Sequence, residues 1–307
     1  MDPGWNGSCF LEDAMDLKRS LEAGDFVVIA EMEPPKGVDV AAMVANAAKV
    51  KEEVTAFMVP EMSNAVMRMS ALGGAMVLSG NRMDTIMQVC CRDRNRIALQ
   101  ADLLAASACG IRNIMAVTGE APSFGDHHQA AAVYDITLDE LLSAIQGLQA
   151  GRDMAGIELS GSPEFLVGGT VNTGLEGSEM AAEIEAMKRK IDAGVRFFIT
   201  PPLFDINAIG PFMNEIGKIK TSTPIHIIPT VVLLKSLGMA RYMAKNMKHI
   251  RISDALIKRI QNAPDKVREC VRIATETASD IKSNGFSGAM ISTMGWEDRL
   301  QDIIHGI

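Results

Sequence analysis

Signals for metal binding and disulfides are scarce in this 307-residue chain. The five cysteines are an odd count, and no two of them form a C-x-x-C pair. Neither a disulfide framework nor a zinc knuckle is therefore indicated. No two histidines have the spacing of a zinc-protease helix, and we expect no metal site. Buried or incidental thiols are the favoured interpretation, with a redox or ligand role as the alternative for Cys90 and Cys91.

Basic blocks and long apolar runs are also absent. The formal net charge is -8, and Lys and Arg form no long block, which argues against a nucleic-acid or anionic-membrane surface. No stretch offers about 18 uninterrupted apolar residues, and the first residues lack a basic start followed by an apolar run. We therefore expect a cytoplasmic protein with no nucleic-acid or membrane partner.

No low-complexity linker or short internal repeat divides the chain. The 26 glycines and 12 prolines are scattered, and a hydrophobic content of 48% is ample for one core. We therefore expect a single domain over residues 1–307, with residues 1–24 as an N-terminal extension that includes a helix.

Short apolar runs alternate with helical patterns along the whole chain. We expect eight strands, at 26–31, 54–59, 85–90, 112–117, 165–171, 196–200, 225–229 and 288–293. Prolines at 34–35, 60 and 201–202 are expected to end three of them. Helices are expected at 13–23, 41–51, 67–79, 96–108, 138–148, 179–193, 206–219 and 233–245, one or two more within 254–284, and one at the C-terminus.

This alternation predicts an α/β protein, a single (βα)8 TIM barrel with extra N- and C-terminal helices. An open doubly wound sheet is the alternative. No G-x-G-x-x-G follows the first strand, which weighs against the dinucleotide-binding form of that sheet.

Polar residues follow the apolar strands at positions that a barrel would bring to one mouth. The run from Ile114 to Val117 shows no alternation, as expected of a strand covered on both faces, and it delivers Thr118, Gly119 and Glu120. Gly119 would let a flat ligand approach the backbone. The residues expected to face the mouth are Glu31, Gln88, Glu120, Asn172, Thr200 and Thr293. Two enclosed acids can hold different protonation states, which suits proton delivery beside a developing cation.

Other polar groups have ordinary explanations. His127 and His128 are expected on a mobile surface loop, and Lys188-Arg-Lys190 is expected on a solvated helix face. Lys190 nevertheless lies one turn before the next expected strand, from which it could reach a phosphate.

Several motifs, in this order, resemble those of the methylenetetrahydrofolate reductase family, and of its short bacterial type without a regulatory domain. They are Glu31-x-x-Pro-Pro-Lys36, Val117-Thr-Gly-Glu120, Lys188-Arg-Lys-Ile-Asp-Ala-Gly194, Phe198-Ile-Thr-Pro-Pro-Leu-Phe-Asp205 and Ile228-Pro229. The resemblance extends from about Phe26 to the end of the chain.

The resemblance implies flavin-dependent reduction of 5,10-methylenetetrahydrofolate to 5-methyltetrahydrofolate, in one-carbon metabolism and methionine biosynthesis. The flavin would be FAD, with FMN as the alternative, and the donor a reduced nicotinamide such as NADH or a ferredoxin-linked system. Glu31 matches the general acid, and Glu120 matches an aspartate between flavin and pterin. Flavin-contact positions fall on Gln88, Thr118, Gly119, Glu120, Tyr134, Asp135, Thr170, Glu183 and Lys190. Folate positions fall on Glu31, Glu120, Thr200, Pro201 and Phe204.

The chain departs from the family pattern at several positions. Glu120 replaces the shorter aspartate, and Pro201 replaces a glutamine. A threonine and a histidine of the flavin site fall on Pro60 and Gln88, and a C-terminal arginine falls on Trp296. The alternatives are therefore a non-catalytic or electron-relay flavin subunit of a larger complex and a pterin-dependent methyltransferase barrel. An oligomer, and a second subunit, are also expected partners.

Overall fold

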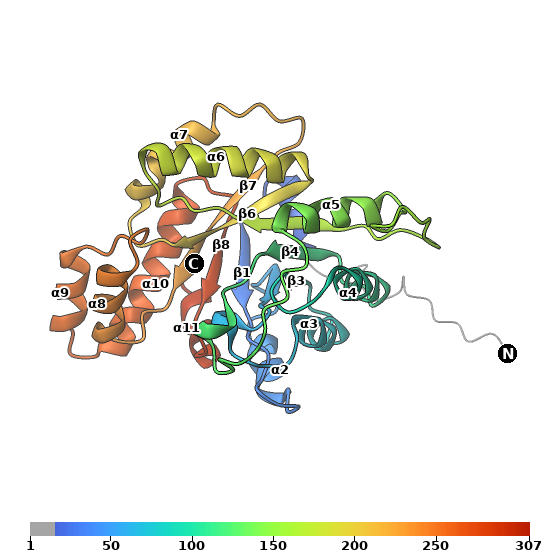
Figure 1. Cartoon of the computed structure of the whole chain (residues 1–307). Coiled ribbons are helices and arrows are strands. Elements are labelled where there is room, and N and C mark those ends of the chain that lie inside the picture. The colour runs from blue at the N-terminus through green and yellow to red at the C-terminus, as the bar shows by residue number, and fades with distance from the viewer. Residues whose placement is uncertain (1–15) are drawn as a thin grey trace.

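Eight parallel strands close into a barrel in the computed structural model, which describes residues 16–307 (Figure 1). Each strand pairs with its neighbours in the sequence, and the first pairs with the last. This confirms the (βα)8 fold. The strands are β1 (Val27–Glu31), β2 (Ala56–Val59), β3 (Thr85–Cys90), β4 (Asn113–Val117), β5 (Leu166–Thr170), β6 (Val195–Pro202), β7 (His226–Val232) and β8 (Gly288–Ser292).

Helices surround the barrel, and short 3-10 turns lie among them. The α-helices are α1 (Leu17–Ala23), α2 (Ala41–Ala48), α3 (Ala71–Gly80), α4 (Arg96–Ala108), α5 (Leu138–Gln149), α6 (Gly177–Asp192), α7 (Gly210–Ile216), α8 (Leu237–Asn246), α9 (Asp254–Asn262), α10 (Lys266–Ser283) and α11 (Leu300–Ile304). The 3-10 turns are η1 (Ser63–Ala65), η2 (Pro122–Phe124), η3 (Ile206–Ile209) and η4 (Glu297–Arg299).

The hydrophobic core has two layers. Alternate strand residues point into the barrel, where Ile29, Met58 and Phe197 pack together. Their neighbours point outward against the helices and form the larger layer, which includes Phe57 and Phe198. Both faces of every strand are therefore covered, which explains why the strands read as continuous apolar runs. Among residues 16–307 no helix is both long enough and apolar enough to cross a membrane.

Capping side chains fix where several helices begin. Thr137 caps α5 as expected and forms a capping box with Glu140. The helices expected from 67 and from 233 begin later, at α3 and α8, because Ser70 and Ser236 accept hydrogen bonds from the backbone N–H three residues on. For the first helix, residues 13–15 lie outside the described part of the chain, and Asp16 caps α1.

β6 runs through the prolines that were expected to end it and continues to Pro202, and β7 extends beyond Pro229, its expected last residue. The register between them shifts after Ile199, and side chains replace part of the ladder there. Thr230 Oγ donates to the carbonyl of Thr200 at 2.6 Å, and the backbone N–H of Thr230 donates to Thr200 Oγ at 3.3 Å. The hydroxyls thus supply bonds that prolines cannot make.

The helix expected at 206–219 is also divided. A 3-10 turn, η3, precedes α7, and Pro211 lies in the first turn of α7. Proline lacks the N–H that would continue a helix and is favoured where one starts. The segment at 254–284 forms two helices, α9 and α10.

Candidate active site

A cavity of about 590 Å³ opens at the carboxyl ends of the strands. That volume falls within the range of small-molecule sites. Most of the predicted residues line it, namely Glu31, Gln88, Thr118, Thr170, Glu183, Lys190, Thr200 and Pro201, together with Asn172 and Pro60. A second hollow, of about 880 Å³, lies at the opposite end of the barrel beside α1. In barrels of this kind the chemistry occurs at the carboxyl ends.

Glu31, the last residue of β1, is one of the two acids that line this cavity, with Glu183. Ser292, at the end of β8, donates its hydroxyl to Glu31 Oε1 at 2.6 Å. Burial raises the pKa of Glu31 above its ordinary value, and the carboxylates of Glu33 and Glu297 raise it further, against the opposing effect of the Ser292 bond. A carboxyl in this environment keeps its proton at a higher pH than a solvated one does.

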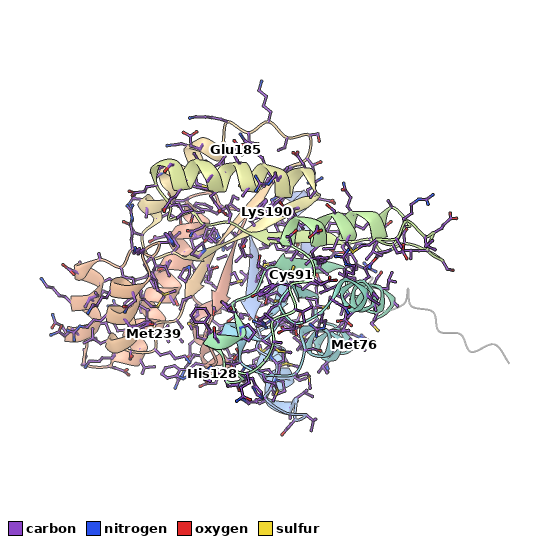
Figure 2. The ribbon with its side chains drawn as sticks, in the orientation of Figure 1. Met76, Cys91, His128, Glu185, Lys190 and Met239 are labelled. Carbon is purple, nitrogen blue, oxygen red and sulfur yellow. The ribbon has the colours of Figure 1, made fainter. Side chains whose placement is uncertain are left out.

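Lys190 is the cation of the cavity and lies on the side of α6 that faces the strands (Figure 2). Its Nζ donates to the carbonyl of Thr170 at 2.7 Å and lies 3.9 Å from Glu183. Burial lowers the pKa of Lys190, while Glu183 opposes that effect. Glu183 also accepts from the backbone N–H of Asn172 at 3.1 Å. The solvated face expected for this basic run therefore describes Lys188, and Lys190 turns inward.

Glu120 lies at the rim of this mouth. Its side chain is exposed on the loop after β4, and its backbone carbonyl accepts from Arg92. Thr293, expected at the mouth, is buried, and among the described residues its hydroxyl has no hydrogen-bond partner. Four of the six polar strand-end residues thus line the cavity, and Glu120 and Thr293 do not.

Three further predicted contacts also lie outside the cavity lining. The hydroxyl of Tyr134 donates to the carbonyl of Gly119 at 3.0 Å. Asp135 forms an ion pair with Arg96 at 2.9 Å, and that guanidinium lowers the pKa of Asp135. Phe204 packs against the outer core beside η3.

Gly119, which was expected to admit a flat ligand, and Gly168 of β5 both lie against side chains of the protein. A Cβ at Gly119 would overlap Cys90 Sγ, and the φ of Gly119 is +85°. A Cβ at Gly168 would overlap the ring of Phe197 inside the barrel. The close approaches that require these two glycines are therefore to the protein's own side chains.

Some residues of the site were not foreseen. Met58, Met115 and Met290 line the cavity from β2, β4 and β8 and give it a soft apolar floor. Ser292 was missed because its contact with Glu31 spans 261 positions in the sequence. The three methionines and Ser292 could have been found by counting along each strand, because every second residue of a strand points into the barrel.

Metal and thiol chemistry receive no support from the part of the chain that is described. Residues 16–307 contain no group of three or more His, Cys, Asp and Glu side chains placed to hold a metal ion. Cys90 and Cys91 are buried at the end of β3, and burial raises the pKa of each thiol to about 11. Such thiols stay protonated near neutral pH and are poor nucleophiles.

The fold and cavity define a (βα)8 barrel with a small-molecule site at the carboxyl ends of its strands, and the half-buried side chains of Glu31, Glu183 and Lys190 line that site. The chain belongs to the methylenetetrahydrofolate reductase family, whose sequence model matches residues 16–307.

Individual relatives are distant. A probable methylenetetrahydrofolate reductase (NADH) from Oryza sativa subsp. japonica is 24% identical over 222 residues, which are 70% of this chain and 36% of that protein. The chain thus matches about a third of that relative's length. An uncharacterized protein from Clostridium thermocellum that binds two copies of 5-methyl-5,6,7,8-tetrahydrofolic acid has a similar structure, with a TM-score of 0.63, 15% identity and coverage of 94% of this chain and 97% of that one. A 2,3-dimethylmalate lyase has a TM-score of 0.50, 11% identity and coverage of 90% and 78%.

Proposed function

We propose that this chain reduces 5,10-methylenetetrahydrofolate to 5-methyltetrahydrofolate with a bound flavin. The observation that carries the proposal is Glu31, a buried carboxyl in the cavity whose pKa is raised. Membership of the methylenetetrahydrofolate reductase family supports it, as does the folate bound by the Clostridium thermocellum protein. The substrate, the flavin and the direction of hydride transfer all belong to this proposal.

The cavity suits a flavin in size and polarity. Its floor is apolar, and Lys190 supplies a half-buried cation at one side that would pair with a phosphate. Glu183, Thr118, Thr170 and Gln88 line the same cavity and would contact the rest of the cofactor. When bound, the flavin would supply the hydride. We propose FAD, with FMN as the alternative, and NADH, NADPH or a reduced ferredoxin as the source of electrons.

Glu31 would deliver a proton to the substrate. The methylene carbon of the folate bridges two nitrogens, and N10 leaves that carbon more readily once it is protonated. A carboxyl whose pKa is raised by burial is suited to that transfer near neutral pH. Ser292 holds the acid in place through its hydrogen bond at 2.6 Å. Departure of N10 leaves a cationic iminium as the hydride acceptor.

Glu120 is the proposed source of electrostatic stabilisation for that cation. It lies exposed on the loop after β4, and its side chain is one methylene longer than the aspartate of the family. A carboxylate at the rim favours a positive charge in the substrate below it. We therefore propose that Glu120 acts on the folate half-reaction and has little part in holding the flavin.

One observation favours the second candidate, a flavin subunit that relays electrons within a larger complex. Pro201, which replaces a glutamine of the family, lines the cavity together with Pro202. A proline side chain has no hydrogen-bond donor to offer a pterin. A subunit of this kind would keep the flavin but lack folate reduction of its own.

Absorbance spectra separate these two functions. The purified chain, loaded with FAD under anaerobic conditions, is treated with NADH, NADPH or a reduced ferredoxin, and methylenetetrahydrofolate is then added. We expect bleaching of the flavin by one donor and its return to the oxidised spectrum on addition of the folate. Bleaching without reoxidation by folate would support the relay subunit, and a chain that binds neither FAD nor FMN would exclude both.

A further inference from the structure

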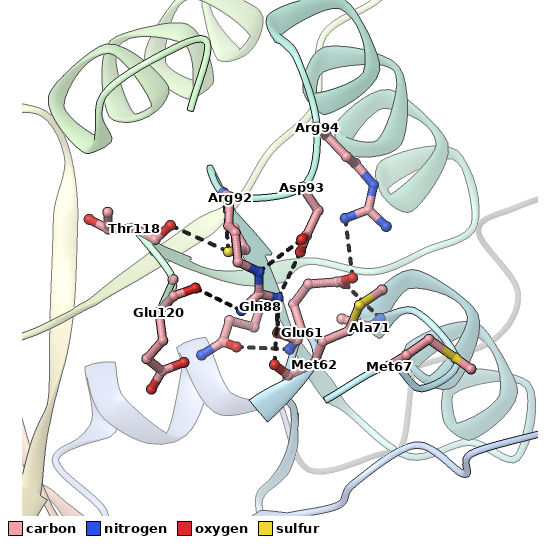
Figure 3. A network of polar contacts seen from close by, with 12 residues as sticks. Glu61, Met62, Met67, Ala71, Gln88, Arg92, Asp93, Arg94, Thr118 and Glu120 are labelled. Atoms are coloured by element: carbon pink, nitrogen blue, oxygen red, sulfur yellow. Dashed lines mark hydrogen bonds and ion pairs between the residues drawn. The ribbon is translucent and has the colours of Figure 1, made fainter. Parts of the chain in front are cut away.

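A buried arginine joins the ends of three neighbouring strands at the mouth (Figure 3). Arg92 follows β3 and is only 2% exposed, which makes it one of the largest fully buried side chains of the described chain. Its guanidinium binds Asp93 through Nε at 2.8 Å and Nη2 at 2.7 Å. The remaining donors reach the carbonyls of Glu61 and Glu120, each at 3.4 Å, and of Met62 at 3.5 Å. One side chain thus connects the loops that follow β2, β3 and β4.

The loop after β2 is held by its side chain as well. Glu61 is 4% exposed, and its Oε2 accepts from the backbone N–H of Ala71 at 2.8 Å. Arg94 lies 3.2 Å from Glu61 Oε1 and also binds Asp102 at 2.8 Å. Glu61 is therefore held at two points, its backbone carbonyl by Arg92 and its side-chain carboxylate by Arg94.

The fixed backbone of Glu61 determines the orientation of Gln88. The N–H of Glu61 donates to Gln88 Oε1 at 2.8 Å. A backbone N–H can only donate, so the amide oxygen must face Glu61 and the amide nitrogen must face the other way. Figure 3 shows that arrangement. Gln88 lines the cavity, and within residues 16–307 its Nε2 has no acceptor.

We propose that Arg92 is a positioning residue that acts through the backbone of Glu61 to present the amide N–H groups of Gln88 to an acceptor atom of the flavin ring. The isoalloxazine ring carries carbonyl oxygens and ring nitrogens that accept such bonds, and their electron density increases when the flavin is reduced. A hydrogen-bond donor that is already fixed in position before the flavin binds loses less conformational entropy on binding than a mobile donor does. This inference rests on the flavin of the proposed function.

The substitution Gln88→Glu separates donation to the flavin from support of the loop. A glutamate keeps an oxygen for the N–H of Glu61 but offers no amide protons to the cavity. We expect roughly tenfold weaker FAD binding in a fluorescence titration, the size typical of one hydrogen bond. The matched control is Gln146→Glu, which makes the same change at an exposed site on α5 and should bind FAD as wild type does.

The role of Arg92 is tested by a double-mutant cycle. Arg92→Lys keeps the charge and loses the planar fork, so Gln88 should lose its fixed orientation and FAD binding should weaken. In the Gln88→Glu background, Arg92→Lys should cause no further loss. The midpoint potential of bound FAD should fall in each single variant, because the donor stabilises the electron-rich reduced ring; a tenfold difference in affinity between the two states corresponds to about 30 mV.

The outcomes distinguish this inference from the proposed function. Wild-type affinity and potential in Gln88→Glu would overturn the donor role while leaving the flavin in place. Independent, additive losses in the double variant would overturn positioning by Arg92. A wild-type chain that binds neither FAD nor FMN would overturn the inference and the proposed function together. If Arg92→Lys does not fold, the donor role still stands or falls on Gln88→Glu and its control.

Discussion

Lys190 carries a charge that the fold only partly compensates. Its ammonium has one carbonyl acceptor at 2.7 Å and a carboxylate at 3.9 Å, and burial lowers its pKa. Transfer of a charged group out of water is costly unless it is paired and hydrogen-bonded. An anionic ligand in the cavity would complete that pairing, which is why this residue is the best test of phosphate binding.

We expect Lys190→Ala to fold and to lose most of its flavin. Removal of a charge-assisted hydrogen bond costs about 1.5–3 kcal/mol, or roughly 10- to 100-fold in affinity. The control is Lys188→Ala on the same helix, where the exposed ammonium pairs with Glu185 at 2.6 Å. The ratio of flavin to protein absorbance after purification measures the effect. Full occupancy in Lys190→Ala would remove this residue from the phosphate site.

Residues of the site were predictable where they lie at or near the carboxyl end of a strand. Glu31, Gln88 and Thr200 follow apolar runs, and the strand-end rule brought them to one cavity. The inward orientation of Arg92 was not predictable, because its sequence neighbours read as a helix cap. Only the three-dimensional arrangement brings the carbonyls of Glu61 and Glu120 to that guanidinium.

At the scale of elements, one buried carboxylate ties the start of α1 to the barrel. Asp84 precedes β3 and accepts from the backbone N–H of Leu17 at 2.9 Å and from Asn113 Nδ2 at 2.9 Å. Burial raises the pKa of Asp84 to about 6, although these donors oppose the effect. The unfolded value is about 3.9. Between these values the folded chain binds more protons, so the contribution of Asp84 to stability decreases as pH rises through this window.

We expect the stability of Asp84→Asn relative to wild type to increase with pH. Between pH 4 and pH 7 the difference in free energy of unfolding should shift in favour of the variant by on the order of 2 kcal/mol, because the variant has no charge to bury. Asp25→Asn, an exposed change beside the same helix, should show no such trend. Urea unfolding of all three chains at several pH values measures this. Parallel curves for Asp84→Asn and wild type would contradict the burial of a charge at this site.

The packing of β5 against β6 gives a second prediction at this scale. Gly168 faces the barrel interior, and the ring of Phe197 occupies the space that a Cβ would take. Overpacking of this kind typically costs about 1–3 kcal/mol. Gly168→Ala should therefore lower the midpoint of thermal unfolding, whereas Gly80→Ala in α3, where a Cβ meets open space, should not. Equal midpoints for the two variants would show that Phe197 moves aside without cost.

Element boundaries were predictable where a side chain marks them. Thr137 signals the start of α5 by its own chemistry. The course of β6 and β7 past their prolines was not predictable, because it depends on hydroxyl bonds between Thr200 and Thr230, which lie on different strands. The residues of one segment predict where that segment ends by itself. Hydrogen-bond partners on a neighbouring strand are known only once the fold is known.

At the scale of the whole molecule, closure of the barrel assembles the proposed acid. Glu31 ends the first strand and Ser292 ends the last. Pairing of β1 with β8 brings Ser292 Oγ to 2.6 Å from Glu31 Oε1. The barrel itself was predictable, because eight apolar runs alternate with helices over the whole chain. The contact between its first and last strands follows only from closure, so the environment that raises the pKa of Glu31 is a property of the complete ring.

The most direct test of the account is the substitution Glu31→Gln, measured by rapid mixing of each half-reaction. The variant keeps the size of the side chain but cannot donate the proton. We expect normal FAD binding, near wild-type reduction of the flavin by its donor, and a folate half-reaction slowed by roughly 10²–10⁴. In wild type, the folate step should slow as pH rises through the raised pKa of Glu31, and the variant should lose that dependence. Equal damage to both half-reactions would make Glu31 structural, and an unchanged folate half-reaction would place the acid elsewhere, with Glu33 the next candidate.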